Sequence, residues 1–429
     1  MASIAIAQTQ QAQATTSAPS AAAAAAPAMQ LEPTSVIVLD SGGGSIKAGW
    51  AHDSQPTIMG NCITRPRSAR RTFVGNELDQ WGDLSGLYYG YPTQKGFIVN
   101  WELQNKIWDH VLSSSVLEVN NFAETSLVLT EPLFNFPAIQ SAMREVAFEE
   151  HGFQSLLHTT APELSAYQQR VDSPSAQEAQ VVVDSGFSST YVVPFVQGQM
   201  LPSCATRIDV GGKVLTNYLK DVLSYRQINL MEETHVVNEM KEKACYVATD
   251  LQHELEKAKQ RPSSNTISVD YVLPDYTTIM KGFVRAPVAR TGPANMSSDE
   301  QLVKLNNERF SVPELLFHPS DVGIKQTGIP ELIGLVVESL EEAAQYYAYQ
   351  NVVLTGGNAR FSGFQARITN DLRALAPSDM PVECSLPTDP QIHAWRGGQS
   401  MVQRGDFAAA AVTRAKYAEY GDAAFSRSR

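Results

Sequence analysis

Two stretches of this chain share one design, and that design restricts the possible folds more than any other part of the sequence. In each, a run of β-branched and aliphatic residues ends in an aspartate, Asp40 or Asp184, and a turn rich in glycine and serine follows. Such a run is typical of a strand buried on both faces, and glycine allows the chain to turn sharply behind it. The repetition predicts two related half-domains that face one ligand.

Both turns have the composition of a phosphate site, because backbone N–H groups exposed at a glycine turn can bind an anion. Lys47 follows the first turn and adds a cation, and Asp40 and Asp184 could each hold a hydrated Mg²⁺ against the phosphate. For either copy alone, a buried strand that ends in a plain hairpin turn remains the alternative. The candidate residues of the two turns are Asp40, Gly42, Gly43, Gly44, Ser45, Lys47, Asp184, Ser185, Gly186 and Ser188.

The charge of the chain restricts its partners. With 33 Lys and Arg against 45 Asp and Glu, the formal net charge is −12. An acidic surface argues against DNA as the main partner, whereas basic proteins such as histones remain possible. The four cysteines have no metal-ligand spacing and are expected to be buried, reduced thiols. No apolar run is long enough to span a membrane.

Together with the two turns, a series of further motifs resembles the actin family, within the actin, Hsp70 and sugar-kinase superfamily. In chain order these motifs are Val99–Trp101, Thr130–Pro132, Lys241–Lys243, Asn307–Phe310, Thr355–Asn358 and Trp395–Gly398. The resemblance runs from Val36 to about Gly421. The resemblance is closest to one nuclear branch of the actin-related proteins. The motifs that indicate this branch include Gln94–Gly96, Phe134–Phe136 and Asp270–Asp275.

The resemblance implies an α/β, actin-like fold of two lobes, each built on a duplicated mixed β-sheet with flanking helices, with a nucleotide cleft between them. We expect a disordered Ala/Gln/Ser-rich tail over residues 1–34. The first lobe would comprise residues 35–168 plus 393–429, and the second residues 169–392. From periodicity we expect helices over Gly96–Leu117, Pro137–Phe153, Val210–Leu223 and Val236–Lys259.

The resemblance also implies the ligand, which is ATP or ADP with Mg²⁺. It places Gly212 near the phosphates, Lys241 and Glu242 at the base and ribose, and Gly356, Gly357 and Asn358 near the adenine. A Lys-Glu pair on a helix is otherwise usual on a solvated face, so this alternative stays open for Lys241 and Glu242.

Several positions depart from the actin pattern. At the positions that orient the hydrolytic water or lie beside them, this chain has Ala161, Phe187, Ser188 and Tyr191 instead of Gln, Asp, Gly and His. Gly43 stands where actins usually offer a hydroxyl to the terminal phosphate, and Asn238 and Gln391 replace basic residues near the base. We expect ATP either to bind between the lobes as a structural ligand or not to bind at all. Any hydrolysis should be very slow.

Two functional classes follow from the resemblance. The first is a nuclear, non-catalytic scaffold subunit of a SWR/SRCAP-type chromatin-remodelling complex, which exchanges the histone variant H2A.Z into nucleosomes. Its partners would be the sibling subunits, with histone or nucleosome touched indirectly. The second is a slow ATPase or a polymerising actin. Only Ser68–Phe73 stands where actins have a longer loop that grips the next filament subunit, so we expect no filament.

One segment, Lys281–Lys304, interrupts the actin pattern with Pro, Gly, Ser and basic residues. We expect a surface insertion that contacts a partner subunit through Arg285 and Arg290, because insertions on a shared scaffold often carry specific contacts. A tolerated surface loop is the alternative.

Overall fold

A computed structural model describes residues 35–261, 264–285 and 300–426. The first of its two large sheets has six strands in the order β20-β10-β9-β1-β2-β3. Strands β1 and β2 form an antiparallel hairpin, and β9 and β10 continue the sheet in parallel on the other side of β1. The strands are β1 (Val36–Ser41), β2 (Ser45–Trp50), β3 (Thr57–Gly60), β9 (Ser126–Glu131), β10 (Ser155–Thr160) and β20 (Val412–Thr413).

The second large sheet repeats this arrangement. Strands β11 and β12 form the antiparallel hairpin, and β18 and β19 follow in parallel on the other side of β11. The strands are β11 (Ala179–Ser185), β12 (Thr190–Val196), β13 (Gln199–Met200), β14 (Thr206–Ile208), β18 (Val352–Thr355) and β19 (Cys384–Ser385). The predicted duplication and the actin-like fold class are confirmed.

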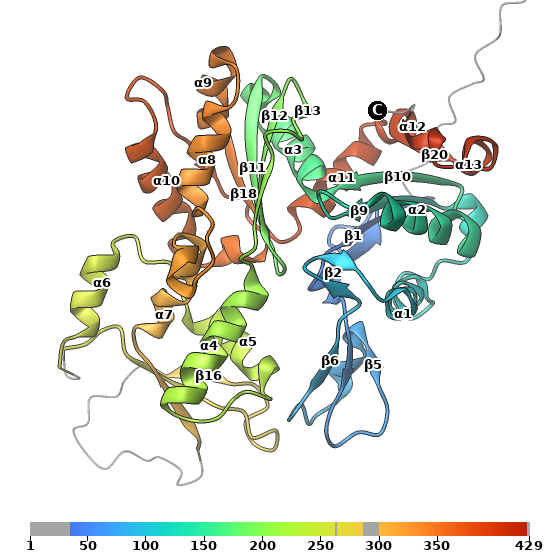
Figure 1. Cartoon of the computed structure of the whole chain (residues 1–429). Helices are drawn as coiled ribbons and strands as arrows, with labels where there is room; N and C mark the ends of the chain where they lie inside the picture. Colours follow the sequence, from blue (N-terminus) through green and yellow to red (C-terminus); the bar gives the residue numbers. More distant parts are fainter. Residues whose placement is uncertain (1–34, 262–263, 286–299, 427–429) are drawn as a thin grey trace, which may run out of the picture.

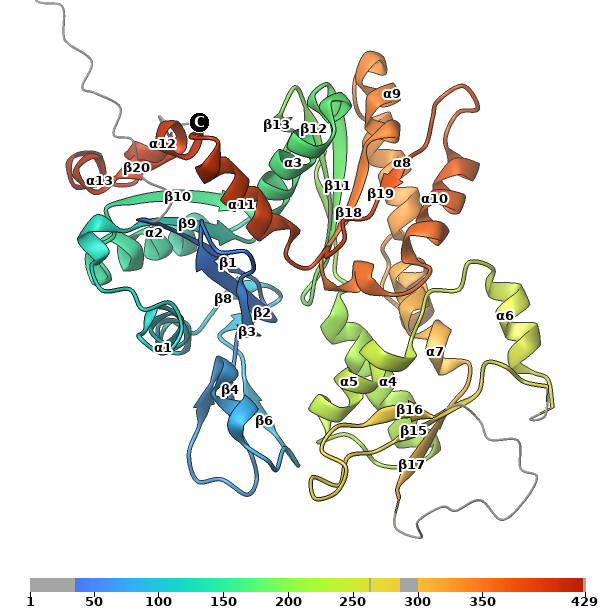
Figure 2. The ribbon, with the colours of Figure 1, turned by 180° about the vertical axis from the view of Figure 1, so that it is seen from behind.

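Two helices, α3 (Ala161–Asp172) and α11 (His393–Gln403), pack against each other between the two sheets (Figures 1 and 2). Their contact is close because α11 carries adjacent glycines. A Cβ on Gly397 would overlap the carbonyl of Leu164 in α3, and one on Gly398 would lie 2.7 Å from Val38 in β1. This glycine pair explains the Trp-Arg-Gly-Gly motif in physical terms, since any side chain would push the helices apart.

Each large sheet extends into a smaller part, and Figure 1 shows the two smaller parts facing each other at the bottom of the view. The part attached to the first sheet is a three-stranded sheet of β4 (Ile63–Arg65), β5 (Phe73–Val74) and β6 (Tyr88–Gly90). The part attached to the second contains helices α4 (Gly212–Arg226), α5 (Thr234–Ala244) and α6 (Leu251–Ala258), with the strands β15 (Val269–Val272), β16 (Phe283–Arg285) and β17 (Leu302–Leu305).

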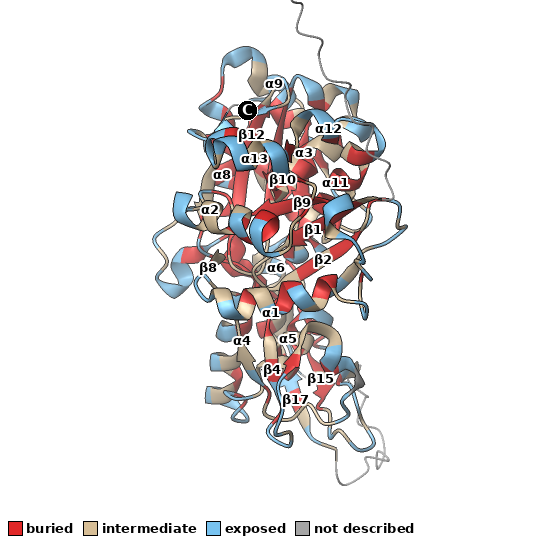
Figure 3. Ribbon diagram, turned by 90° about the vertical axis from the view of Figure 1, so that its right-hand side faces the viewer, coloured by how far each residue is buried: buried red, intermediate tan, exposed pale blue. Residues whose placement is uncertain are grey.

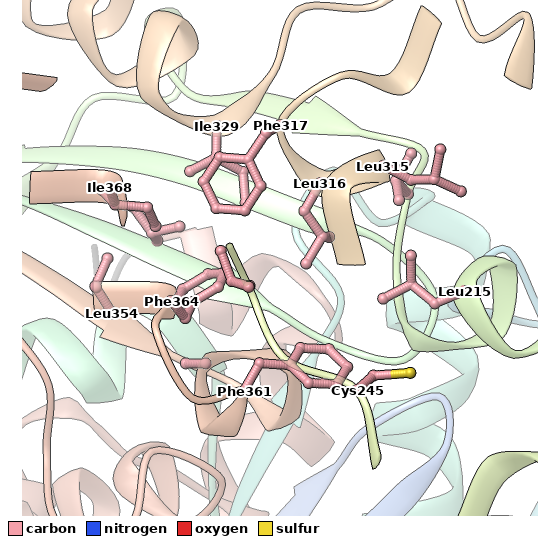
Figure 4. Close-up of a cluster of buried hydrophobic side chains, with 14 of the residues drawn as sticks. Leu215, Cys245, Leu315, Leu316, Phe317, Ile329, Leu354, Phe361, Phe364 and Ile368 are labelled. Carbon is pink, nitrogen blue, oxygen red and sulfur yellow. The ribbon is translucent and has the colours of Figure 1, made fainter. Parts of the chain in front are cut away.

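The central strands of the large sheets are almost entirely buried, as the red strands in Figure 3 show, whereas edge strands such as β3 and β13 are partly exposed. The largest core cluster lies in the second half of the molecule, where α4, α8 (Ile329–Glu338) and α10 (Phe364–Leu375) cover the sheet. Figure 4 shows Phe317, Phe364 and Ile368 meeting there around Leu354 of β18. Burying a large apolar side chain contributes roughly 1.5–3 kcal/mol, so this cluster fixes β18 firmly beside β11.

Two predicted helices are wrong in their extent. The helix expected over Val236–Lys259 is two helices, because α5 ends at Ala244 and α6 begins at Leu251. The backbone between them bonds elsewhere, with the Val247 N–H donating to the carbonyl of Ser362 at 2.9 Å. The helix expected over Gly96–Leu117 is α1 (Trp101–Leu112), which the side chain of Asn100 caps by accepting from Leu103 N–H at 3.0 Å.

Two other predicted helices agree more closely with the structure. The helix expected from Val210 is α4, which begins at Gly212. The helix expected over Pro137–Phe153 is α2 (Pro137–Glu145), which is followed by a π-helical turn, η4 (Val146–Glu150).

The ends of the expected insertion belong to the fold. Strands β16 and β17 both pair with β15, and Val303 is fully buried. Arg285 Nη2 lies 2.9 Å from Glu300 Oε2, so this arginine is engaged within the chain instead of standing free for a partner. Arg290 and the predicted tail 1–34 lie outside the described residues. Residues 286–299 of the expected insertion lie outside the described residues as well.

Two composition-based expectations can be compared with the structure. Of the four cysteines, all free, Cys62, Cys245 and Cys384 are buried, whereas Cys204 is only half-buried. Among the described residues, no helix has both the length and the apolar character that a membrane span needs.

Candidate functional site

A cleft of about 1120 Å³ lies between the two halves of the molecule and has both glycine turns in its wall. The turn Gly42–Gly44 connects β1 to β2, and the turn Gly186–Ser189 connects β11 to β12. The predicted site residues that line this cleft are Asp40, Gly42, Gly43, Gly44, Ser45, Lys47, Asp184, Gly186, Ser188, Gly212, Lys241, Glu242, Gly356, Gly357 and Asn358. Ser185 does not line it, since this residue is fully buried beneath the second turn.

The first turn is held by hydrogen bonds on both sides of the strand end. Thr130 Oγ1 donates to Asp40 Oδ1 at 2.8 Å, and Lys47 Nζ lies 3.3 Å from Asp40 Oδ2. Asp40 and Lys47 are direct cross-strand partners in the hairpin, so the register itself brings the cation to the carboxylate. Asn61 Nδ2 donates to the carbonyl of Gly42 at 2.9 Å and fixes the turn from outside.

The second turn is held by the start of α4. The backbone N–H groups of Gly212 and Lys213 donate to the carbonyls of Gly186 and Phe187, each at 2.9 Å. A Cβ on Gly211 would lie 2.6 Å from the Ser189 nitrogen, which explains why the helix opens on glycine.

Asn358 and Gly356 fix the same turn from the β18 side. Asn358 Nδ2 donates to the Gly186 carbonyl at 2.8 Å. Gly356 has a φ of +87°, and a Cβ there would overlap the backbone of Ser185, so only glycine fits this close approach.

Asp184 is the electrostatically strained group of the cleft. Burial, and after it the nearby Asp40, raise the pKa of Asp184 to about 6, although Lys47 offsets part of the effect. A hydrated Mg²⁺ at this point would relieve that strain, since oxygen ligands suit this hard cation. The residues present therefore fit Mg²⁺, with Asp40 and Asp184 as the groups that would hold its waters.

On the expected base side, Lys241 is engaged within the protein. Its ammonium donates to Gly212 O at 3.2 Å and to Thr216 Oγ1 and Asn238 Oδ1 at 2.9 Å each. Asn238 in turn donates to Glu242 Oε1 at 2.8 Å. With three N–H groups already bonded, Lys241 shapes the cleft wall and holds α5 against α4.

Sequence reasoning missed a basic residue on this side of the cleft. Arg360 lines the cleft, and its Nη1 donates to Gln391 Oε1 at 2.9 Å. Gln391 replaces a basic residue of the actin pattern, but Arg360 supplies a positive charge beside it. Its place two residues after the Thr355–Asn358 motif was a signal that could have identified it.

Three of the positions that depart from the actin pattern, Phe187, Tyr191 and Ala161, line the cleft with apolar or hydrogen-bonded side chains. A Cβ on Gly44 would overlap the ring of Phe187, and that ring lies 5.5 Å from the ring of Tyr91. The Tyr191 hydroxyl accepts a hydrogen bond from Arg207 Nη1 at 3.3 Å, and burial raises the pKa of Tyr191. Ala161, the first residue of α3, presents only a methyl group.

Contacts across the cleft, which the sequence did not indicate, join the two halves. Arg67 Nη2 lies 2.6 Å from Glu232 Oε2, and the Tyr89 hydroxyl lies 3.1 Å from His235 Nδ1. The ammonium of Lys213 lies 5.0 Å from the centre of the Tyr91 ring. Arg67, which lies in the basic stretch after Arg65, is thus directed at the opposite side of the cleft.

The model of the Actin family matches residues 31–428 of this chain. The chain belongs to the actin family. Its relatives place it in the actin-related protein 6 branch. It is 40% identical to actin-related protein 6 of Drosophila melanogaster over 392 residues, which cover 90% of this chain and 98% of that protein. It is 36% identical to the Arabidopsis thaliana protein of the same name over 420 residues, covering 91% and 98%.

A third relative, actin-related protein 6 of Neurospora crassa, is 36% identical over 422 residues, which cover 92% of this chain and 94% of that protein. Nucleotide binding is general in the actin family, and in this actin-related chain both glycine turns are retained on one cleft. The family resemblance inferred from the motifs is therefore confirmed over nearly the whole chain.

Proposed function

We propose that this chain is a non-catalytic, nuclear subunit of a SWR/SRCAP-type chromatin-remodelling complex, which exchanges the histone variant H2A.Z into nucleosomes. The observation that carries the non-catalytic part is the packing of Phe187. Its ring covers Gly44 and contacts Tyr91 where hydrolysing actins place a water-orienting aspartate, so the cleft has an apolar surface at that point. The ATPase motor of the complex would then be another chain, and this chain would be a rigid scaffold to which other subunits bind.

The proposal includes ATP or ADP with Mg²⁺ as a structural ligand. The two turns present glycine backbone at the cleft wall, Lys47 supplies a positive charge, and Asp184 carries a strain that a cation would relieve. Mg²⁺ would supply charge neutralisation between the phosphates and the two aspartates. A nucleotide that touches both halves stabilises the folded chain by mass action and restricts their relative motion.

The proposed partners are sibling subunits of the remodeller, with histone or nucleosome contacted through them. The net charge of −12 favours basic partners over a nucleic-acid backbone. Because Arg285 is paired with Glu300, the partner contact proposed for the insertion rests on residues 286–299, Arg290 among them.

Purification tests the proposal directly. A tagged copy expressed at its natural level should be recovered from nuclear extract with a fixed set of remodelling subunits, a motor ATPase among them. Depletion of the chain should lower H2A.Z occupancy at chromatin. Expression of the Lys47→Met variant in the depleted cells should restore that occupancy, because the proposed role of the chain requires assembly and not hydrolysis. Recovery as a lone cytoplasmic protein, or unchanged H2A.Z occupancy after depletion, would reject the proposal.

The second class, a slow ATPase or polymerising actin, retains support only from the two intact turns. The connection between β4 and β5 spans residues 66–72, which is short for a loop that must reach a neighbouring subunit. Assays of hydrolysis and of filament formation separate this class from the scaffold function.

A further inference from the structure

A second, smaller cavity lies where α3, α11 and the strands β18 and β19 come together. Its volume is about 330 Å³, at the lower end of the range for ligand sites. Among the described residues, none lines both this cavity and the cleft. Two carboxylates, three side-chain amides, three serine hydroxyls and one imidazole contribute to its wall, whereas no lysine or arginine of the described chain does. The cavity is therefore polar, and its formal charge is negative.

The imidazole belongs to His393, the first residue of α11. This residue is only 3% exposed, and its Nε2 has no hydrogen-bond partner in the part of the chain that the structure describes. Burial, and after it the charge of Arg396, lower the pKa of His393 to about 4, so the ring is neutral at pH 7 and one of its nitrogens is an acceptor. A buried polar atom is normally hydrogen-bonded, so this side chain indicates that the cavity has an occupant.

The cavity is preformed, because hydrogen bonds between its own side chains hold its walls. Asn351 Oδ1 accepts from Ser175 Oγ at 2.9 Å, and this bond ties the start of β18 to the turn after α3. Ser385 Oγ donates to Gln169 Oε1 at 3.4 Å, and this second bond ties β19 to α3. A ligand that enters the cavity therefore meets acceptors that are already in place, which reduces the entropy lost on binding.

The two carboxylates, Asp172 and Glu383, stand at the mouth of the cavity. Both residues are exposed, as is Leu386 beside them in the lining, so the cavity opens to solvent. Asp172 Oδ1 accepts from Gln168 Nε2 at 3.0 Å. Glu383 has no ion-pair partner within the described ranges, and its carboxylate is available to a ligand. A concave site lined by charges of one sign attracts the opposite charge, so the occupant should be a cation.

We propose that this cavity binds the guanidinium group of an arginine side chain that a partner protein presents. A guanidinium carries five N–H donors in one plane, so it can donate to Asp172, Glu383 and His393 from a single position. Its alkyl chain can lie against Leu386 at the mouth. A lysine ammonium fits less well, because its charge is compact and strongly hydrated. Free arginine fits less well too, since the two carboxylates repel its α-carboxylate, which an arginine within a polypeptide lacks.

The cavity has a particular place in the molecule. Its wall includes residues of α3 and α11, the two helices that pack between the large sheets. A partner held through an arginine in this cavity would therefore be anchored at the junction of the two halves. The inference requires neither a nucleotide in the cleft nor the proposed role in remodelling, so it can fail without affecting either.

The test uses the full chain and a short capped peptide of glycine and serine with one central arginine, with affinity measured by NMR titration. Copies with citrulline or lysine at the central position are the reference peptides. Citrulline has nearly the shape of arginine without its charge, so the arginine peptide should bind about tenfold or more tightly than the citrulline peptide, and also more tightly than the lysine peptide.

Variants of the chain locate the binding. Asp172→Asn/Glu383→Gln should weaken binding of the arginine peptide by about tenfold or more and leave the melting temperature unchanged, because both side chains are exposed. Asp221→Asn/Glu331→Gln, which removes two exposed carboxylates outside the cavity, is the matched control and should bind like the parent. His393→Leu removes the buried acceptor and should weaken binding as well. The variant with both mouth carboxylates replaced decides the matter even if His393→Leu lowers stability.

Four results would overturn the inference. The first is no binding of the arginine peptide, and the second is equal affinity for the citrulline peptide. The third is equal weakening by the mouth variant and its matched control, which would assign binding to the overall negative charge of the chain. The fourth is tighter binding of free arginine than of the peptide, which would assign the cavity to a small molecule instead of a partner protein.

Discussion

Lys47 Nζ lies 3.3 Å from Asp40 Oδ2, and this one ammonium must also serve Asp184, whose carboxylate faces the same part of the cleft. One cation between the buried carboxylate of Asp40 and the half-buried carboxylate of Asp184 leaves a net negative charge that little water can screen. The unfavourable electrostatic energy of the ionised Asp184 is seen in its pKa, which is raised to about 6.

The first prediction concerns stability and pH. Because the pKa of Asp184 is about 6 in the folded chain and near 3.8 when unfolded, the folded chain binds the proton more tightly. The contribution of Asp184 to stability should therefore fall as pH rises from about 4 to 6 and stay lower above that. Asp184→Asn should remove this loss and raise the free energy of unfolding at pH 7 by at most about 3 kcal/mol.

Urea unfolding of the nucleotide-free protein between pH 4 and 8 measures this, with the exposed Asp221→Asn on α4 as control. The gain should shrink when Mg²⁺ and ATP are added, because the cation already relieves the carboxylate. A variant less stable than the parent at pH 7 would show that the charge of Asp184 is needed for the fold.

The second prediction concerns hydrolysis. A single-turnover assay with Mg²⁺-ATP should give negligible phosphate release, because the positions that orient water carry Ala161, Phe187 and Tyr191. Groups of this kind contribute roughly 10²–10⁴-fold each. Release at the rate of a hydrolysing actin, abolished by Asp184→Ala, would contradict the prediction and identify this cleft as the source.

The third prediction concerns self-association. The purified chain should stay monomeric in salt and Mg²⁺ that polymerise actin, since β4 and β5 are joined by the short connection 66–72. Sedimentation velocity across a concentration series measures it. Sedimentable filaments visible by electron microscopy are the contrary result.

The fourth prediction concerns a buried ion pair in the second half. Arg367 donates to Glu314 Oε1 at 2.9 Å and Oε2 at 3.1 Å, with both residues nearly inaccessible. Arg367→Met leaves Glu314 with only His318 nearby, whose Nε2 lies 3.8 Å from Glu314 Oε1, and should destabilise the chain by about 3–5 kcal/mol. Adding Glu314→Leu should recover most of that loss. The exposed pair Lys106–Glu102 offers a matched control, and Lys106→Met should cost no more than about 0.5 kcal/mol.

The fifth prediction concerns the segment 286–299. Arg285 and Glu300 contact each other, so a short Gly-Ser bridge can join them without disturbing β16 or β17. The shortened chain should keep its melting temperature but lose affinity for its sibling subunits in a pull-down. Replacement by a Gly-Ser segment of the original length separates loss of side chains from loss of reach. Undiminished assembly in both would show that the segment is only a tolerated loop.

The strand ends and turns were predictable because local chemistry decides them. A β-branched run followed by Asp and Gly has few alternatives, and both copies of it became the hairpins that carry Asp40 and Asp184. The break between α5 and α6 was not predictable, since the intervening backbone is held by distant carbonyls such as that of Ser362. The Phe283–Arg285 strand was missed for the same reason, because three residues acquire strand character only through pairing with β15.

At the cleft, sequence placed the glycine turns but not the contacts that cross between the halves. Which side chains meet there depends on how α3 and α11 orient the two sheets, and no local pattern encodes that angle. Lys213 and Tyr91 are therefore unremarkable in sequence although their side chains meet in the structure.

The edge strand β20 pairs with β10 through Thr413 and Ser155, so the first sheet is completed by residues from opposite ends of the chain. The ribosome releases all of β11, β12, β18 and β19 before it releases β20. We therefore expect β10 to have an unpaired edge while the other half of the molecule is synthesised and folds. Nascent chains halted before Val412 should accordingly depend on chaperones that shield strand edges, and the final step of folding should be the docking of the carboxyl-terminal helices.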